Sequence, residues 1–165
     1  MATSIKRRPF LVWSVDMDEP TRLSPVRLLA HLENSRNWPE ASLHRGPYDF
    51  PRLGIEFHGS AGFSLLCFEN EASLGYLAAS GLHLSPPSVL VCLGGQVIEK
   101  WPKELFLSAT ETRRVLQDFD QTGKQSESVR WVRLDRFRRI IVHPGGRGLI
   151  PLWEKLRVAP GFPFA

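Results

Sequence analysis

The 165-residue sequence contains only two cysteines, Cys67 and Cys92, and each lies alone in an apolar stretch. Such isolated cysteines exclude a disulfide framework and the paired spacing of a structural zinc site, and we expect buried, reduced thiols. No apolar run approaches the roughly 18 residues that a membrane-spanning helix needs. The N-terminus has a basic stretch but no long apolar core or small-residue cleavage site, so the expected location is the cytoplasm, with no membrane partner.

Motifs that mark the common enzyme classes are also missing. Neither a phosphate-binding loop nor a dinucleotide fingerprint occurs, although a glycine-rich "PGGRGL" stands at 144–149. The five histidines lack the spacing of a zinc-binding helix, and no zinc-deaminase signature is present. The sequence therefore predicts no catalytic residue, no metal and no cofactor, and a protein that is not an enzyme. An enzyme of an unrecognised type stays open as an alternative, and a deep pocket lined by titratable residues would mark it.

The formal charge of +4 is unevenly distributed along the chain. Residues 1–40 carry six basic and five acidic side chains, residues 41–129 carry seven and ten, and residues 130–165 carry eight and two. The net charges are therefore +1, −3 and +6, so the basic character belongs to the C-terminal part. Such an asymmetry bears on binding partners and says little about the fold.

The order of the predicted elements indicates an α+β domain that occupies residues 1–165. Ser24 before Pro25, and Ser108 three residues before Glu111, predict the starts of two helices. Three prolines and a glycine predict a loop over 37–51. A mostly antiparallel sheet, an N-terminal helix and a second helix before the last core strand follow from this order. We expect strands over 10–16, 52–59, 63–71, 75–80, 88–95, 96–101, 128–134 and 140–142, and helices over 24–37, 108–123 and 151–156.

Two stretches contain charged residues that suggest binding. Glu69 and Glu71, two residues apart at a strand end, suggest an acid pair or an acidic edge that faces a partner. Between Arg130 and Arg139, five arginines alternate with aromatic residues in "RWVRLDRFRR". This segment is either a strand whose arginines are exposed while Trp131, Leu134 and Phe137 are buried, or a surface for nucleic acid or an acidic protein. A small basic nucleic-acid-binding module is thus the alternative function.

An ordered set of motifs runs through residues 88–131. A strand ends in a double glycine, a Trp-Pro pair closes the next strand, a helix ends at Thr-Gly, and a final strand contains a tryptophan. The glycines suit a hairpin turn, and the proline should end strand pairing because it has no N–H. The residues concerned are Leu93, Gly94, Gly95, Trp101, Pro102, Phe106, Thr122, Gly123 and Trp131.

With the strand pair before it, this order resembles the bacterial immunity proteins found beside deaminase-fold toxins in polymorphic toxin systems. The resemblance covers residues 52–131, and a basic extension, 132–165, continues beyond it. It implies an inhibitor without enzymatic activity that binds a cognate toxin domain. Trp101, Phe106 and Trp131 would then belong to the core, and the partner contacts are expected among exposed acidic and aromatic residues: Glu69, Glu71, Glu99 and Trp38.

Overall fold

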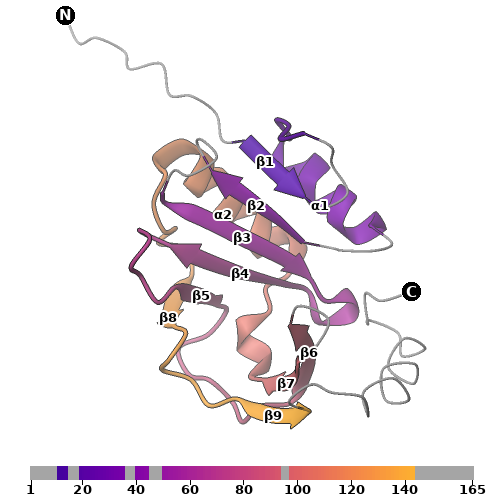
Figure 1. Ribbon diagram of the computed structural model, residues 1–165, viewed down its shortest axis with the longest axis vertical. Helices are drawn as coiled ribbons and strands as arrows, with labels where there is room; N and C mark the ends of the chain where they lie inside the picture. The colour runs from indigo at the N-terminus through magenta and orange to yellow at the C-terminus, as the bar shows by residue number, and fades with distance from the viewer. Residues whose placement is uncertain (1–10, 15–18, 36–39, 45–49, 94–96, 144–165) are drawn as a thin grey trace, which may run out of the picture.

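The computed structural model describes residues 11–14, 19–35, 40–44, 50–93 and 97–143, and its elements are shown in Figure 1. Two α-helices and nine β-strands form within these ranges, together with two short 3-10 helices. The strands are β1 (Leu11–Ser14), β2 (Glu40–His44), β3 (Arg52–Phe57), β4 (Phe63–Phe68), β5 (Tyr76–Ala79), β6 (Val89–Leu93), β7 (Val97–Trp101), β8 (Arg130–Arg133) and β9 (Ile140–His143); the helices are α1 (Pro25–Asn34), α2 (Ala109–Thr122), η1 (Gly59–Ala61) and η2 (Lys103–Leu105).

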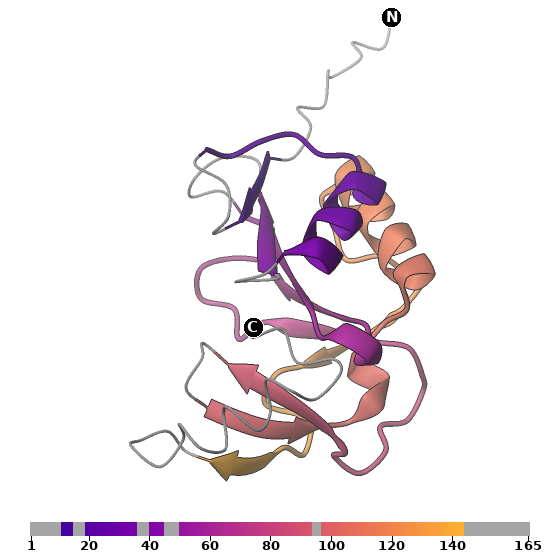
Figure 2. The same cartoon turned by 90° about the vertical axis from the view of Figure 1, so that its right-hand side faces the viewer.

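The strands form two antiparallel sheets instead of the single sheet expected. The larger sheet has six strands in the order β1-β2-β3-β4-β5-β8, and the smaller has three in the order β6-β7-β9. Figure 2 shows α1 and α2 together on one side of the larger sheet, with the smaller sheet at its far end. The expected α+β class, with an early helix and a second helix before β8, is confirmed.

Both predicted helix starts are confirmed. The Ser24 hydroxyl accepts from the Arg27 N–H with Pro25 at the first helical position, and Ser108 forms a capping box with Glu111. Gly123 ends α2 in the left-handed conformation, with φ of 68°, which glycine adopts without a steric penalty. No described helix is long and apolar enough to cross a membrane.

The main core lies between the two helices and the larger sheet. Side chains from alternate positions of β3 and β4 point to this face, because successive residues of a strand alternate between faces. Leu53, Ile55 and Leu65 are at most 2% exposed there and pack with Leu116 and Phe119 of α2. Val26 of α1, by contrast, is 54% exposed.

Cys67 belongs to the same core, and Cys92 is buried in β6; both are buried, reduced thiols, as expected. Burial, with a smaller contribution from Glu69, raises the pKa of the Cys67 thiol to about 11. A thiol with such a pKa is protonated at neutral pH and is a poor nucleophile.

A second core joins the smaller sheet to the opposite face of the larger one. Leu77 of β5 and Val132 of β8 point to this face and pack with Trp101, Phe106 and other residues of the smaller sheet and its surroundings. Trp101 and Phe106 are 5% and 6% exposed, so the expected burial of both is confirmed. The smaller sheet thus covers only the β5–β8 end of this face.

The predicted loop over 37–51 is wrong in its middle part. Residues 40–44 form β2, which pairs with both β1 and β3, and Ala41 and Leu43 point into the main core. The strand has only two buried apolar residues of alternating position between flanking prolines, so its pattern was too short to outweigh the turn residues. The cross-strand neighbours decide its conformation.

The double glycine at 94–95 and the predicted helix at 151–156 lie outside the described residues. The strands on either side of the double glycine, β6 and β7, pair antiparallel in register from Val89 with Trp101 to Leu93 with Val97. The hairpin expected there is thus confirmed, and β7 ends at Trp101, immediately before Pro102.

Candidate functional site

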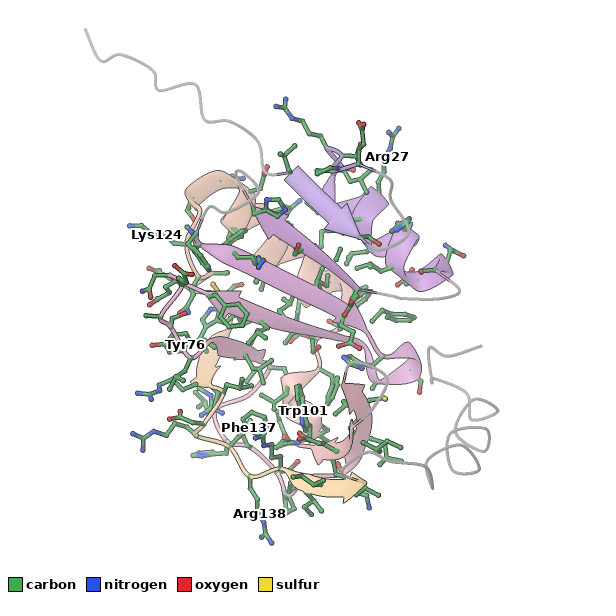
Figure 3. The ribbon with its side chains drawn as sticks, viewed as in Figure 1. Arg27, Tyr76, Trp101, Lys124, Phe137 and Arg138 are labelled. Carbon is green, nitrogen blue, oxygen red and sulfur yellow. The ribbon has the colours of Figure 1, made fainter. Side chains whose placement is uncertain are left out.

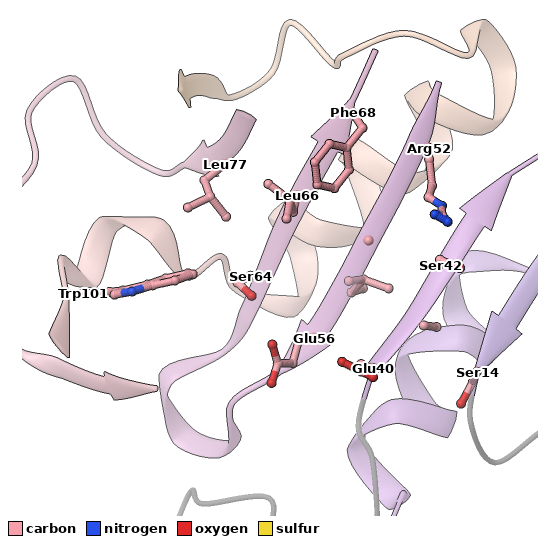
Figure 4. A pocket seen from close by; sticks show the side chains of 13 residues that line it. Ser14, Glu40, Ser42, Arg52, Glu56, Ser64, Leu66, Phe68, Leu77 and Trp101 are labelled. Carbon is pink, nitrogen blue, oxygen red and sulfur yellow. The ribbon is translucent and has the colours of Figure 1, made fainter. Parts of the chain in front are cut away.

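A groove of about 330 Å³ lies on the face of the larger sheet opposite the helices, beside the smaller sheet. The close-up in Figure 4 shows its side chains along β2, β3 and β4, with Trp101 at the flank. It forms where the cover provided by the smaller sheet ends, and its position follows from the two-sheet arrangement. The lining residues are Ser14, Glu40, Ala41, Ser42, Arg52, Gly54, Ile55, Glu56, Ser64, Leu66, Phe68, Leu77 and Trp101.

Small residues, Ser42 and Gly54, leave space at the centre of the groove. Ser42, Gly54 and Leu66 are cross-strand neighbours in one row, so their side chains share this face. A methyl group added at Gly54 would reach only ordinary contact distance from Leu66, at 3.6 Å or more. Gly54 therefore leaves space above the sheet, whereas Leu66 and Leu77 form an apolar wall with Trp101.

Two carboxylates face each other at one end of the groove. Glu40 of β2 and Glu56 of β3 are direct cross-strand partners, and Figure 4 shows both side chains at this end. Burial, and secondarily the charge of Glu40, raises the pKa of Glu56 to about 8. Like charges at directly opposite positions destabilise a sheet, so this pair costs folding free energy unless a proton or a cation compensates it.

His58 and Ser64 lie next to Glu56. The His58 Nε2 atom is 2.8 Å from the Ser64 hydroxyl and 3.6 Å from a Glu56 carboxylate oxygen, and His58 is only 5% exposed. Burial lowers the pKa of His58 to about 4, so near neutral pH the imidazole is uncharged while the neighbouring carboxyl of Glu56 is protonated. His58 is thus enclosed, whereas the side chain of Glu56 is 24% exposed.

These three residues do not form a catalytic relay. In a serine–histidine–acid triad, the hydroxyl and the carboxylate contact opposite nitrogens of the imidazole. Here Ser64 and Glu56 both approach Nε2. The carboxyl of Glu56 has a pKa suitable for proton exchange near neutral pH, but the described surroundings provide no activated nucleophile beside it.

Trp101 connects the groove to a buried polar network. Its indole Nε1–H donates to Glu99 at 2.8 Å, and the second oxygen of Glu99 is 3.5 Å from the Arg139 guanidinium. Its ring also packs against Phe106 and Phe137. Phe106 in turn lies edge-on to His58, at 5.1 Å between ring centroids. The aromatic residues of the smaller sheet thus reach the wall of the groove.

Glu99 was expected to be an exposed contact residue, and this expectation is wrong. The residue is 3% exposed, because β9 and the segment before it cover β7. The signal that favoured exposure was its charge, but a glutamate in a strand can be buried when donors surround it, and Trp101 and Arg139 supply them.

The other predicted contact residues have different outcomes. Glu69 and Glu71 are both exposed, in the turn just after β4, and lie outside the groove. Trp38 lies outside the described residues, as do Gly94 and Gly95. Trp131 is half-buried, and its indole N–H donates to the Ser126 carbonyl at 2.9 Å.

The basic segment between Arg130 and Arg139 is only partly integrated into the fold, since Arg136, Arg138 and Arg139 are exposed. Arg133 pairs with Asp135 at 2.8 Å, Arg139 contacts Glu99, and Phe137 is 9% exposed. Figure 3 shows Phe137 beside Trp101, while Arg138 points outward. The aromatic residues of this segment therefore pack internally, whereas stacking on nucleic-acid bases would need exposed rings.

The groove contains two acidic residues that sequence analysis did not select. The alternation of residues along β3 puts Glu56 on the same face as Gly54 and Arg52, and this pattern could have indicated Glu56 as a groove residue. Glu40 could not be found in this way, because it belongs to β2, a strand that the sequence did not predict. Across the described ranges, no group of three or more potential metal ligands occurs.

Comparison of the chain with family models, curated proteins and solved structures found no match.

Proposed function

We propose that this chain is an immunity protein that binds a cognate bacterial toxin domain, of deaminase fold, and neutralises it as a stoichiometric inhibitor in the cytoplasm of the producing cell. The observation that supports binding is the open form of the groove, whereas its titratable carboxyls, Glu40 and Glu56, are the feature expected of the alternative, an enzyme of an unrecognised type. The groove is an open hollow on a sheet, with an apolar wall and two facing carboxylates, but without the relay geometry that covalent catalysis requires.

The ordered motifs of residues 88–131 are a second, separate support for the proposal. Trp101, Pro102 and Phe106 close the smaller sheet and lead into α2, and Gly123 ends that helix. These residues build a scaffold at the flank of the groove. A scaffold of this kind suits a protein that presents a preformed surface, because little ordering is then required upon binding.

Charge distribution is consistent with such a partner. A toxin that modifies nucleic acid needs a basic substrate surface, and residues 41–129 of this chain have a net charge of −3. Complementary charge increases the rate of association and disfavours incorrect partners. Glu69 and Glu71, which are exposed, remain predicted contacts together with Trp38.

The proposal is tested by mixing the purified chain with the toxin domain encoded next to its gene. We expect a 1:1 complex in size-exclusion chromatography with light scattering. Toxin activity should fall linearly with added protein and vanish at one equivalent. Independent elution of the two proteins with full toxin activity would contradict the proposal, and so would inactivation by far less than one equivalent, which indicates turnover.

A further inference from the structure

We propose that the groove is the binding site for one arginine side chain of the toxin partner, with the guanidinium held by Glu40 and Glu56 and the aliphatic part against the half-buried Leu66. This inference takes its partner from the proposed function and assigns the contact surface. It differs from the sequence-based prediction, which placed the acidic contacts at Glu69, Glu71 and Glu99.

The acidic end of the groove lacks a cation among the described residues. Glu40 and Glu56 are direct cross-strand partners, and no described lysine or arginine forms an ion pair with either. The neighbouring His58 is an uncharged imidazole near neutral pH, because burial lowers its pKa to about 4. A positive charge placed between the carboxylates would turn an unfavourable pair into a favourable contact.

The wall of the groove suits a long basic side chain. Leu66, which is half-buried, presents apolar surface along one side, and the almost fully buried Leu77 and Trp101 complete this wall. Lysine and arginine bury their methylene groups against such surface. A volume of about 330 Å³ admits a side chain but no secondary-structure element.

Arg52 makes the two ends of the groove electrostatically different. It lies on the same face of β3 as Glu56 and four residues away, about 13 Å along the strand. A cation is repelled at the Arg52 end and attracted at the acidic end. A planar guanidinium also matches two carboxylates better than a compact ammonium does, because its several N–H groups point in fixed directions.

The first experiment needs no toxin. The ¹⁵N-labelled full-length chain is titrated at pH 9 with acetyl-Gly-Arg-Gly-amide and, separately, with the same peptide in which neutral citrulline replaces arginine. We expect saturable shifts at Gly54, Ser64 and the Trp101 indole, with a dissociation constant on the order of 1 mM, and at least tenfold weaker binding of the citrulline peptide. The citrulline arm removes the ligand charge and leaves the protein unchanged, so it does not depend on the folding of a variant.

Ionisation of Glu56 gives this binding a defined pH dependence. The described ionisable groups that contact or face it are Glu40 and His58, and its pKa of about 8 reflects burial first and Glu40 second. The peptide guanidinium stays charged throughout, so affinity should rise about tenfold between pH 7 and pH 9 as Glu56 loses its proton. An affinity that is equal at both pH values would overturn the assignment to this carboxylate pair.

Variants then locate the site. Glu40→Gln with Glu56→Gln should weaken peptide binding at least tenfold, whereas Glu33→Gln with Glu127→Gln removes the same charge from exposed positions away from the groove and should change it less than twofold. Absence of saturable binding at pH 9, or equal binding by both double variants, would overturn the proposal.

The same variants are finally tested against the toxin domain. If the wild type neutralises the toxin and Glu40→Gln/Glu56→Gln does so with unchanged affinity, the groove is not the binding site for a toxin arginine, while the immunity function stands. Neutralisation weakened at least tenfold by this variant alone supports both. If the arginine peptide binds as described but no toxin is neutralised, the immunity function fails and the assignment of the groove to a partner's arginine fails with it, although the cation site itself remains.

Discussion

The two faces of the six-stranded sheet use the same strands for opposite purposes. One face, covered by α1 and α2, is closed by Leu53, Leu65 and other residues with at most a few per cent exposure. The other face is covered by the smaller sheet only at its β5–β8 end, and the groove opens where this cover stops. Adjacent residues of one strand thus stabilise the fold and shape a binding surface, because side chains alternate between the faces.

The sharpest way to test this difference is to truncate neighbouring residues of β4. Leu65 is 0% exposed in the main core, whereas Leu66 is half-buried at the groove wall. Leu65→Ala should lower the free energy of unfolding by about 3–4 kcal/mol through lost burial and a residual cavity, and Leu66→Ala by less than half of that. Urea denaturation measures both, and equal losses would mean that the two faces are equally closed.

A smaller effect is expected where the chain turns into β4. Gly62 has φ of 103°, and a Cβ atom there would collide with the carbonyl oxygen of Leu107. Leu107 forms an isolated antiparallel β-bridge with Phe63, which joins β4 to the segment before α2. Gly62→Ala should therefore cost about 2–3 kcal/mol, combining backbone strain with the displaced bridge.

Thermal unfolding at several denaturant concentrations would give the Gly62→Ala value. A suitable control is Gly54→Ala, whose added methyl group enters open space on the groove face at ordinary contact distance. A Gly62→Ala protein as stable as the Gly54→Ala protein would contradict the geometry described at this turn.

The Glu56 carboxyl of the groove predicts how stability depends on pH. The pKa of Glu56 is about 8 in the folded state and 4.5 for an unperturbed glutamate, so the folded state holds the extra proton and stability falls as the pH rises from 4.5 to 8. For His58 the folded pKa, about 4, is below the unperturbed value of 6.5, so its contribution is lost as the pH falls through that interval. Between pH 4.5 and pH 6.5, Glu56 and His58 therefore change the free energy of unfolding in opposite directions.

Between pH 6.5 and pH 8, the effect of Glu56 on the free energy of unfolding is not offset by that of His58. The wild type should lose about 1–2 kcal/mol of unfolding free energy over this interval, and Glu56→Gln should remove that loss. Denaturation measured at half-unit pH steps tests the expectation. A wild-type slope that persists unchanged in Glu56→Gln would assign the effect to another group.

The smallest expected effect concerns the polar network of the second core. Arg139 contacts the buried Glu99, but its own side chain is 48% exposed, so solvent screens much of the interaction. Arg139→Ala should cost about 1 kcal/mol or less, with a smaller loss in high salt. Arg138→Ala, one residue away and without a described ion pair, removes the same charge and should have no measurable effect.

Local patterns were sufficient for elements whose signals lie within a few residues. Ser108 and Glu111 predicted the start of α2, Gly123 its end and Pro102 the end of β7, because capping and strand termination depend on nearby backbone groups. The pairing of β6 with β7 also followed from adjacent segments.

Features that depend on distant segments were predicted poorly. Strand β2 needs β1 and β3 on either side, and its own five residues do not outweigh the prolines around it. The burial of Glu99 depends on Arg139 and β9, forty residues further along the chain. Neither pairing could be inferred from charge or periodicity alone.

Periodicity and local hydrogen bonding were enough to predict the α+β class, the two helices with their caps, most strands and the two buried thiols. The division into two sheets, the partial cover of the larger sheet by the smaller one, and the meeting of Glu40 and Glu56 at the uncovered part all depend on long-range packing. Burial and pKa follow from what packs against a side chain, and those neighbours come from remote parts of the chain.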